Sequence, residues 1–518
     1  MVRSFFNGTR ERIKIKSNKQ QQNNITLKVS KSLQTNLDNL RNLLDKPNDL
    51  KIREFKFGEE NIKCAFAYIN GLVDIKTIEL SVLNNIQTIA NLPKESEQLF
   101  TYIQEKFISL IDVQVGTTLD DLSLAILSGS TIFYVDGVDS VLMIDTSGGE
   151  MRQVDEPVTE TLIRGPRNGF VESLQTNIGM IRRNITDPNL RFKSHFTGRR
   201  SKKRLVITYV EGIVNPKLVE EVERRLKTID MDIVSESGYI EAWIEDSYLS
   251  PFPQIINTER PDKVARSLMY GKVAILLDGT PFALIVPISF PDILRSPEDY
   301  YERWTVGSLL RILRYAGAFI SIFLPAIYIA LTALQPGMLP SMLAFSIAGT
   351  REGVPFPPVI EALMMVITME LLQEAGVRLP QTIGQTVGIV GGLVIGEAAV
   401  QADIVSPIMV IVVALTAIAN FAIPAYSIAI TFRIIRFFFI MAAAFFGLYG
   451  IVLAYIMVNI HFVNLKSFGV PYTTPFAPFI KADWEDTIIR LPIPMLKERH
   501  SYLLPKDDTP VDNKGGKK

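Results

Sequence analysis

The chain has 518 residues, with 54 basic residues balanced by 54 acidic ones, one cysteine and three histidines. This balance provides no net field that would favour nucleic acid as a partner, and so few cysteines and histidines argue against a disulfide framework or a metal site. We expect no bound cofactor. The length exceeds what one hydrophobic core fills. Charged residues are frequent before position 300, whereas 315–460 contains apolar runs of about 20 residues, enough to cross a bilayer. The expected fold class is therefore α+β with a membrane part: a soluble N-terminal half followed by an α-helical multi-span membrane domain.

The two ends of the chain are polar. Residues 1–44 begin with a basic stretch that is followed by a run rich in Gln and Asn, without the apolar core of a signal peptide. We interpret them as a flexible arm, with weak attraction to anionic lipid headgroups as the alternative role. Residues 466–518 are assigned to a C-terminal segment and tail.

The soluble half repeats itself. The stretch "AFAYINGLVD" from Ala65 matches "VITYVEGIVN" from Val206, which aligns Gly71 with Gly212. Further along, "LSGSTIFYVDG" from residue 127 matches "LMYGKVAILLDG" from residue 268, in the same order and at nearly the same separation, which indicates an internal duplication. Each copy should contain a buried strand ending at a Gly turn, a helix such as "NPKLVEEVERRLKTI" and a hairpin through Asp-Gly. The repeat predicts two α/β subdomains, at 45–160 and 201–292.

An arginine-rich connecting segment at 161–200 lies between the copies. Its arginines are candidates for contacts between subdomains or subunits: Arg164, Arg167, Arg182 and Arg183. The alternative is a cleft that holds a carboxylate or phosphate. The soluble half contains no GxGxxG fingerprint, P-loop or Ser/His/Asp set, so we expect no enzymatic activity.

The membrane domain is expected at 293–465. In "SPEDYYERW", Ser296 is a predicted helix N-cap and Pro297 the first helical residue, and one continuous helix should run from there, through a kink at Pro325, into a span near 315–334. Arginines precede this span, which by the positive-inside rule places the soluble half in the cytoplasm. Further spans are predicted near 383–402, 404–431 and 434–461. Arg433 and Arg436 interrupt the apolar sequence near the start of the last span and are interpreted as an interfacial anchor.

Glycines recur every fourth residue in the first of these later spans. They are Gly384, Gly388, Gly392 and Gly396. Such a stripe predicts close helix packing in lipid, where packing replaces the hydrophobic drive.

The stretch "PFPPVIEALMMVITMELLQEAGVRLP", residues 355–380, is apolar and yet acidic at Glu361, Glu370 and Glu374. Its leading prolines force extended backbone, which is tolerated at membrane depth only where protein or water covers it. We therefore predict a re-entrant element or an inner helix at 354–374. Counting it as a full span gives five crossings and an external C-terminus, whereas a re-entrant element gives four and leaves both termini in the cytoplasm.

Three roles compete for these acids. The helix could lie at the membrane surface with its acids in water, or Glu361 or Glu374 could form ion pairs with Arg351 or Arg378. In the third role, copies from several subunits surround an axis and form a cation-attracting ring next to an apolar constriction, which we favour for Glu370 and Glu374. The candidate ion-pathway residues are Glu361, Leu363, Val366, Ile367, Glu370 and Glu374.

Four long blocks give the chain a family resemblance over about residues 45–495. They are "RGPRNGFVESLQTNIGMIRRNI", "SPEDYYERW", "REGVPFPPVIEALMMVITMELLQEAGVRLP" and "IGQTVGIVGGLVIGEAAV". With these blocks the chain resembles the A subunits of the GerA-type spore germinant receptors. The resemblance implies a location in the spore inner membrane and two partners, a transporter-like B subunit that binds the nutrient and a lipoprotein C subunit. It also implies an oligomeric ion channel, taken to be a pentamer, with both termini cytoplasmic, which favours four spans.

The resulting hypothesis is a non-enzymatic, multi-pass membrane subunit that forms or gates a cation channel and so starts germination when its partner binds nutrient. A stand-alone secondary transporter is one alternative. That class predicts inverted repeats among the membrane segments, whereas the repeat found here lies in the soluble half. A structural scaffold for receptor clusters is the other alternative.

Overall fold

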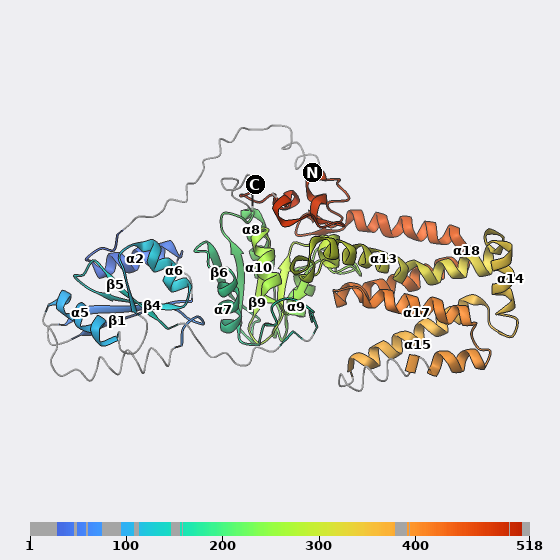
Figure 1. Cartoon of the computed structure of the whole chain (residues 1–518), viewed down its shortest axis with the longest axis horizontal. Coiled ribbons are helices and arrows are strands. Elements are labelled where there is room, and N and C mark those ends of the chain that lie inside the picture. Colours follow the sequence, from blue (N-terminus) through green and yellow to red (C-terminus); the bar gives the residue numbers. More distant parts are fainter. Residues whose placement is uncertain are drawn as a thin grey trace. The chain divides into compact units, whose positions relative to one another are not determined.

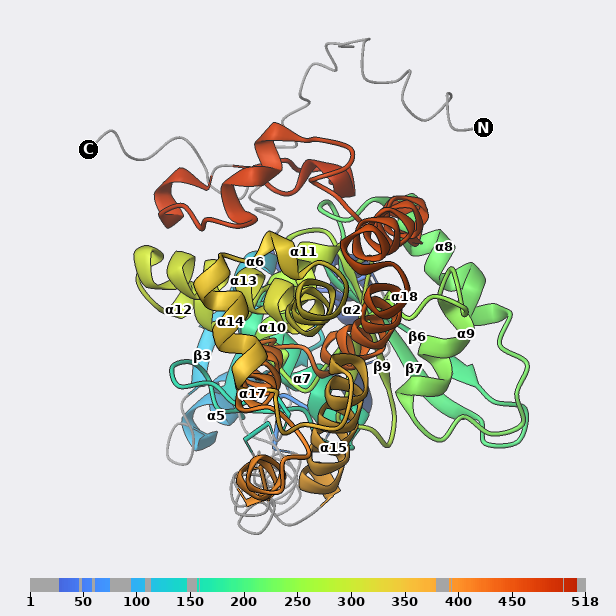
Figure 2. The same cartoon turned by 90° about the vertical axis from the view of Figure 1, so that its right-hand side faces the viewer.

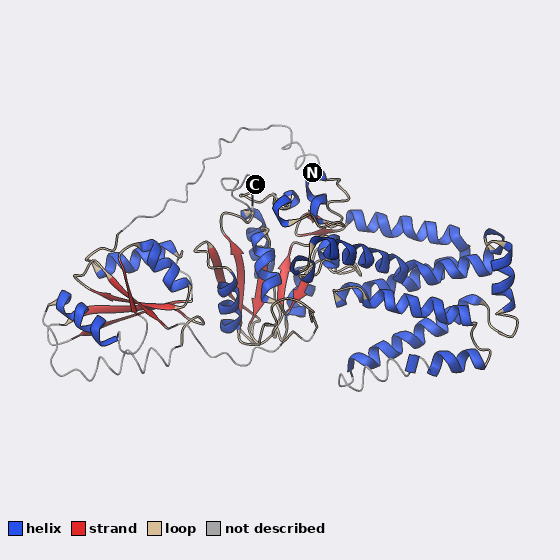
Figure 3. Cartoon of the chain, viewed as in Figure 1, coloured by secondary structure: helices blue, strands red, loops and turns tan. Residues whose placement is uncertain are grey.

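The computed structural model describes residues 28–45, 49–57, 61–74, 95–107, 113–146, 156–157, 159–378, 391–392, 394–496 and 498–509. The chain forms two compact units. The first is Met1–Val154 with Ser173–Ser194, and the second is Asp155–Glu172 with His195–Lys518. Strands and helices alternate in the N-terminal half, and helices dominate the C-terminal half (Figures 1 and 3).

The first unit is built on a five-stranded sheet of order β1-β2-β4-β5-β3, in which neighbouring strands are antiparallel. Its elements up to residue 145 are α2 (Leu33–Leu43), β1 (Leu50–Phe57), β2 (Ile62–Ile69), α5 (Ser96–Phe107), β3 (Val113–Gly116), α6 (Leu119–Leu127), β4 (Ser130–Val135) and β5 (Val141–Asp145). Successive residues of a strand face opposite sides of a sheet. Ala65 and Ala67 of β2 accordingly pack with α2 and α6, whereas Cys64 and Phe66 pack with α5. Helices therefore cover both faces of the sheet at β2.

A second sheet repeats this order as β6-β7-β9-β10-β8. The elements from residue 174 to 286 are α7 (Leu174–Asn184), β6 (Leu190–Thr197), β7 (Lys203–Val210), α8 (Pro216–Lys227), α9 (Ser237–Ile244), β8 (Ile256–Thr258), α10 (Pro261–Met269), β9 (Val273–Leu277) and β10 (Ala283–Val286). Matched glycines adopt the same left-handed backbone, with φ of 94° at Gly71 and 87° at Gly212, and 91° at Gly137 and 85° at Gly279. The predicted duplication and its glycine turns are confirmed.

The helix α2 corrects the prediction that residues 1–44 form a flexible arm. Leu33, Leu37 and Leu40 of this helix are buried in the first core. The sequence "SLQTN" stands both at 32–36 and at 173–177, so α2 and α7 are the first helices of the two copies. In each case the serine caps its helix by accepting a hydrogen bond from the threonine amide three residues on. The repeat therefore begins at Ser32, and α7 belongs to a copy and not to a connecting segment.

The continuous helix expected from Ser296 is interrupted. After α11 (Phe290–Leu294), the short α12 spans Glu298–Tyr301 and α13 begins only at Trp304. Glu302 and Arg303 between them are extended, with ψ of 174° and 145°. Pro325 lies inside α13 (Trp304–Ile329), which ends in a π-helical turn at Ala330–Leu334. The prediction failed because the residues after the N-cap make tertiary contacts, described below, that a straight helix would not allow.

The other predicted span boundaries also shift. The helices that follow are α14 (Ser341–Gly349), α15 (Pro358–Arg378), α17 (Pro407–Phe421) and α18 (Tyr426–Asn464). The span predicted at 404–431 is wrong because Pro424, which cannot donate a backbone hydrogen bond, separates α17 from α18. In the described part of the chain, two helical stretches are long and apolar enough to cross a membrane, Trp304–Leu334 and Tyr426–Asn464, while α17 is apolar but shorter. A domain of four or five crossings is not established by these helices.

The helix α18 folds back on itself at Gly447. Thr431 Oγ1 donates to Pro251 O at 2.6 Å, and His461 Nε2 lies 2.8 Å from Ser250 Oγ. A straight helix would separate residues 431 and 461 by about 45 Å, yet they contact consecutive residues. Gly447, midway between them, has φ of 61° and ψ of −138°, and Leu448 N donates to Gln335 Oε1 at 2.9 Å. Each limb is close to the bilayer core in length, about 30 Å.

The C-terminal segment returns to the second α/β domain. Tyr472 OH donates to Pro253 O at 2.8 Å, and Phe290 N donates to Tyr472 O at 2.8 Å. The view in Figure 2 shows α13 beside α17 and α18, with the segment after residue 465 outside this helical group. The chain thus leaves the second α/β domain through α13 and comes back to it after α18, so the helical part can cross a membrane only an even number of times.

Candidate functional site

Glu361 of α15 is fully buried within the helical part of the chain. Its side chain is 0 % exposed, and its Oε1 accepts from Arg351 Nη2 at 2.8 Å. Its Oε2 accepts from the backbone N–H of Ser406, the residue that caps α17, at 2.9 Å. A buried carboxylate that is fully paired in this way holds α15, α17 and the turn at residue 351 together.

Glu370 joins three helices. It lies 3.1 Å from Arg436 Nη1 and 3.4 Å from Arg433 Nη1, both from α18. Arg436 also donates through Nε to the carbonyl of Ser321 in α13 at 2.7 Å. Arg436 is 4 % exposed and Arg433 14 %, so these arginines are internal ion-pair partners and the interpretation as an interfacial anchor is wrong.

The remaining residues of α15 divide between a buried and an exposed face. Val366 is 1 % exposed and Leu363 packs against the same core, whereas Ile367 is 48 % exposed and Glu374 is also exposed. A residue that is buried within one protomer cannot line an axis between protomers. Glu361 and Val366 are thus buried within the protomer, whereas Ile367 and Glu374 have the exposure that the predicted ion pathway requires.

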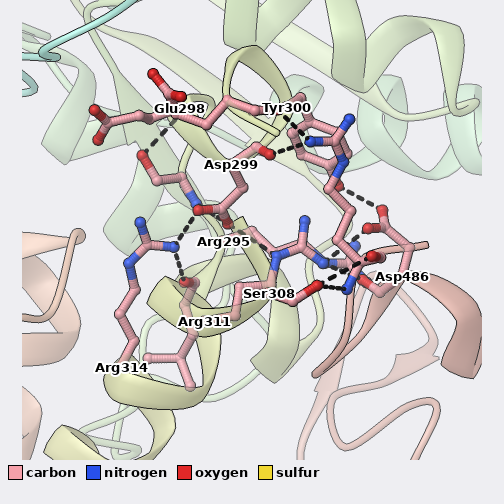
Figure 4. Close-up of polar contacts among 12 residues, drawn as sticks. Arg295, Glu298, Asp299, Tyr300, Ser308, Arg311, Arg314 and Asp486 are labelled. Carbon is pink, nitrogen blue, oxygen red and sulfur yellow. Dashed lines mark hydrogen bonds and ion pairs between the residues drawn. The ribbon is translucent and has the colours of Figure 1, made fainter. Parts of the chain in front are cut away.

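A second charge network fastens α13 to the α/β domain and to the C-terminal segment (Figure 4). Asp299 of α12 is 0 % exposed and accepts from Arg311 Nε at 2.9 Å and from Arg314 Nη1 at 2.6 Å. Arg311 also pairs with Asp486 at 2.7 Å, and the hydroxyl of Tyr300 donates to the same carboxylate. The network therefore spans the break between α12 and α13.

Arg490 of the C-terminal segment adds hydrogen bonds to both sides of the break between α12 and α13. Arg490 Nη1 donates to the carbonyls of Asp299, at 2.5 Å, and Glu302, at 3.0 Å. Arg490 N also donates to Ser308 Oγ of α13 at 3.1 Å. These bonds satisfy the carbonyls left open by the extended residues before α13.

Electrostatics keep the acids of this region charged. Burial would raise the pKa of Asp486, but Arg295 and Arg311 outweigh it and hold that pKa below its usual value. Asp292 behaves alike: burial opposes its ionisation, while Lys272 at 2.7 Å and Arg295 at 3.2 Å hold its pKa well below the usual range. The region is thus a set of buried ion pairs.

Comparison with known proteins identifies the family. A family model described as the Bacillus/Clostridium GerA spore germination protein matches residues 38–502. This chain belongs to the GerA family of spore germination proteins. Spore germination protein GerLA of Bacillus cereus is 50% identical over 470 residues, which cover 91% of this chain and 95% of that protein. Spore germination protein KA of Bacillus subtilis (strain 168) is 45% identical over 474 residues, covering 91% and 87%.

A solved structure also matches this GerA-family chain. It is the N-terminal domain of the A subunit of the Bacillus megaterium spore germinant receptor GerK3, which is 35% identical, with a TM-score of 0.42. The match covers 51% of this chain and 98% of that one. The role of this family is in spore germination, and the match over most of the chain extends that role to this protein.

The predicted glycine stripe can be located only in part. Gly384 and Gly388 lie outside the described residues. A Cβ atom at Gly396 would lie 3.3 Å from Val410 Cγ1 of α17, whereas a Cβ at Gly392 would meet no atom of the described residues within 4 Å. The stripe therefore packs within the chain at Gly396 and faces open space at Gly392.

The four predicted arginines fall in two units. Arg182 is 2 % exposed, pairs with Asp49 at 2.7 Å and stacks on Phe192, and so ties α7 to the start of β1. Arg183 is exposed in the same unit. In the second unit, Arg164 lies 3.7 Å from Glu302 and Arg167 lies 3.9 Å from Glu156. The side chains of these two arginines are 64% and 76% exposed. Such exposed pairs contribute little to stability.

Sequence reasoning missed the network around Asp299. It interpreted Arg311 and Arg314 only as positive charges flanking a span. A signal was present, because the two arginines are three residues apart on one helical face and an acid precedes them by a few turns. The link between Arg311 and Asp486 had no signal, since that pairing spans 175 residues.

Proposed function

We propose that this chain is the A subunit of a nutrient germinant receptor in the spore inner membrane. Several copies, five by family resemblance, form or gate a cation channel that opens when a transporter-like B subunit binds nutrient, and a lipoprotein C subunit completes the receptor. The chain acts without catalysis and keeps its soluble half and its C-terminal segment on the cytoplasmic side.

One observation carries the channel proposal, the outer face of α15. Ile360, Ile367, Leu371 and Glu374 are all exposed, at 40%, 48% and 66% for the three apolar residues. Their spacings of seven, four and three residues put them on one face of the helix. The carboxylate of Glu374 at the end of this apolar stripe would be costly to leave in lipid, and it would be sheltered from lipid if copies of α15 surrounded an axis. Such a ring would attract cations at Glu374 beside an apolar constriction.

The test replaces Glu374 by Gln in spores and measures cation release after nutrient is added. Loss of the ring charge should slow release while protein abundance, measured by immunoblot, stays unchanged. Glu352→Gln is the matched control, because Glu352 is an exposed acid outside α15. Glu370→Gln is unsuitable because Glu370 pairs with two arginines within the chain. Unchanged release in Glu374→Gln, or a monomer as the only species in mild detergent, would contradict the channel.

A further inference from the structure

We propose that the second α/β domain binds a small oxyanion, a phosphate or a carboxylate group, in a cavity where α10 meets α12 and the C-terminal segment. The cavity has a volume of about 70 Å³. Its charged and polar lining includes Asp262, Lys263, Arg266, Ser267, Tyr270, Lys272, Asp292, Arg295 and His500. This inference concerns the soluble domain and does not depend on the channel.

The first argument is an excess of positive charge. Asp262 is neutralised by Arg260 at 3.1 Å, and Lys263 by Glu160 at 2.6 Å. Three cations remain in the lining and face one acid, because Lys272 and Arg295 share the carboxylate of Asp292 and Arg266 adds a third charge. Among the residues that the structure describes, no carboxylate lies within ion-pair distance of Arg266.

His500 does not add to this charge in its observed contact. Its Nε2 lies 3.0 Å from Arg295 Nη1, and because an arginine nitrogen can only donate, the histidine nitrogen is the acceptor in this contact. Asp486 does not line the cavity and is paired with Arg311 at 2.7 Å, although its negative charge also acts on Arg295. The lining therefore carries a formal charge of two positive units, from three cations and one anion.

The second argument is an unused donor. Arg295 Nε is buried and has no hydrogen-bond partner within the described chain, although its Nη1 is bonded. A buried N–H without an acceptor is costly, and a guanidinium is well suited to the oxygens of phosphate and carboxylate. The guanidinium of Arg266 is held over the ring of Tyr300 at 3.5 Å, so its orientation is already fixed. The hydroxyls of Ser267 and Tyr270 are further possible donors.

The position of the cavity suggests two sources of the ligand. Ser296, Pro297 and Tyr300 line it, and α13 begins four residues after Tyr300 at Trp304. If α13 crosses a membrane, the cavity lies close to the lipid surface. The oxyanion could then be a free ion or the phosphate of an anionic lipid headgroup. In either case the ligand would add an acceptor to the ion pairs that hold α12.

The experiment uses the full chain purified in a neutral detergent and follows thermal unfolding at constant ionic strength set with chloride. The probes are inorganic phosphate, acetate and short-chain phosphatidylglycerol, with short-chain phosphatidylcholine as the uncharged comparison. We expect a saturable rise in the unfolding midpoint. A rise with phosphate or acetate indicates a free ion, and a rise with phosphatidylglycerol alone indicates a lipid headgroup.

Variants of the lining residues test whether the probe binds in this cavity. Arg266→Gln and Lys272→Gln should each weaken the apparent affinity by at least about tenfold, the cost of a lost charged hydrogen bond. Arg224→Gln, an exposed arginine on α8, should leave it unchanged. No saturable shift with any probe, or equal affinity in both cavity variants and the parent chain, would overturn the proposal.

Discussion

Replacement of Asp299 by alanine should destabilise the attachment of α13 more than any exposed substitution nearby. The carboxylate is fully buried and accepts from Arg311 at 2.9 Å and Arg314 at 2.6 Å. Without it, Arg311 keeps Asp486, but the remaining bond of Arg314 is one to the carbonyl of Leu294 at 3.5 Å, the limit for a hydrogen bond. Arg314 is 10% exposed and would become a largely uncompensated buried charge. Breaking a buried pair in this way costs about 3–5 kcal/mol.

A conservative substitution separates charge from shape. Asn at position 299 keeps the size and one oxygen acceptor but loses the negative charge, so Asp299→Asn should cost less, about 1.5–3 kcal/mol. Both losses should appear in equilibrium unfolding of the purified full chain. Tryptophan fluorescence is a suitable signal because Trp304 and Trp484 lie within a few residues of the network on each side.

The control for this prediction is Glu298→Ala. Glu298 precedes Asp299 in α12, and the hydrogen bonds that it forms in the structure are made by its backbone. Its replacement should therefore change the free energy of unfolding by less than about 0.5 kcal/mol. An Asp299→Ala variant that is no less stable than Glu298→Ala would refute the idea that this carboxylate holds α13.

Three further predictions concern other parts of the chain. Gly447→Ala should lower the free energy of unfolding in denaturant by about 1–3 kcal/mol, because a φ of 61° is strained for alanine and a Cβ would lie 2.6 Å from Oε1 of Gln335. Gly337→Ala is the control, because a Cβ at Gly337 meets open space. Burial raises the pKa of Glu241 from 4.5 to about 7, so between these pH values the folded chain binds more protons than the unfolded chain. Stability should therefore fall as the pH rises through this interval. Glu241→Gln should make this fall smaller, which hydrogen exchange in α9 would measure. Gly396→Leu should lower the yield of folded protomer on size exclusion, because its side chain meets α17, whereas Gly392→Leu should not.

The duplicated α/β fold was predictable because its signals are local. Glycines that require a left-handed backbone, such as Gly71 and Gly212, recur at fixed offsets, and each follows a strand-length apolar run. The same logic could have extended the repeat to Ser32. The polar composition of the preceding residues hid the "SLQTN" match with Ser173, and α2 was assigned to a flexible arm as a result.

The helical half was less predictable because its decisive contacts join distant positions. Hydropathy located apolar runs, but it could not show that Arg436 pairs with Glu370, 66 residues earlier, and therefore treated the arginine as a boundary. The reversal at Gly447 was missed for a related reason. The run 434–461 has the length of one span, and only the contacts of Thr431 and His461 with neighbouring residues show that the chain turns back.

The break before α13 changes how the soluble domain can act on the helices. A continuous helix would pass on a movement through the stiffness of its backbone hydrogen bonds. Here Glu302 and Arg303 are extended, so the coupling depends on the pairs that Asp299 and Arg490 make across the break. Ion pairs are discrete, and each buried pair costs several kcal/mol to open without a replacement. Movement between the domain and α13 would therefore have to break or exchange these ion pairs, and could not occur by gradual bending of one helix.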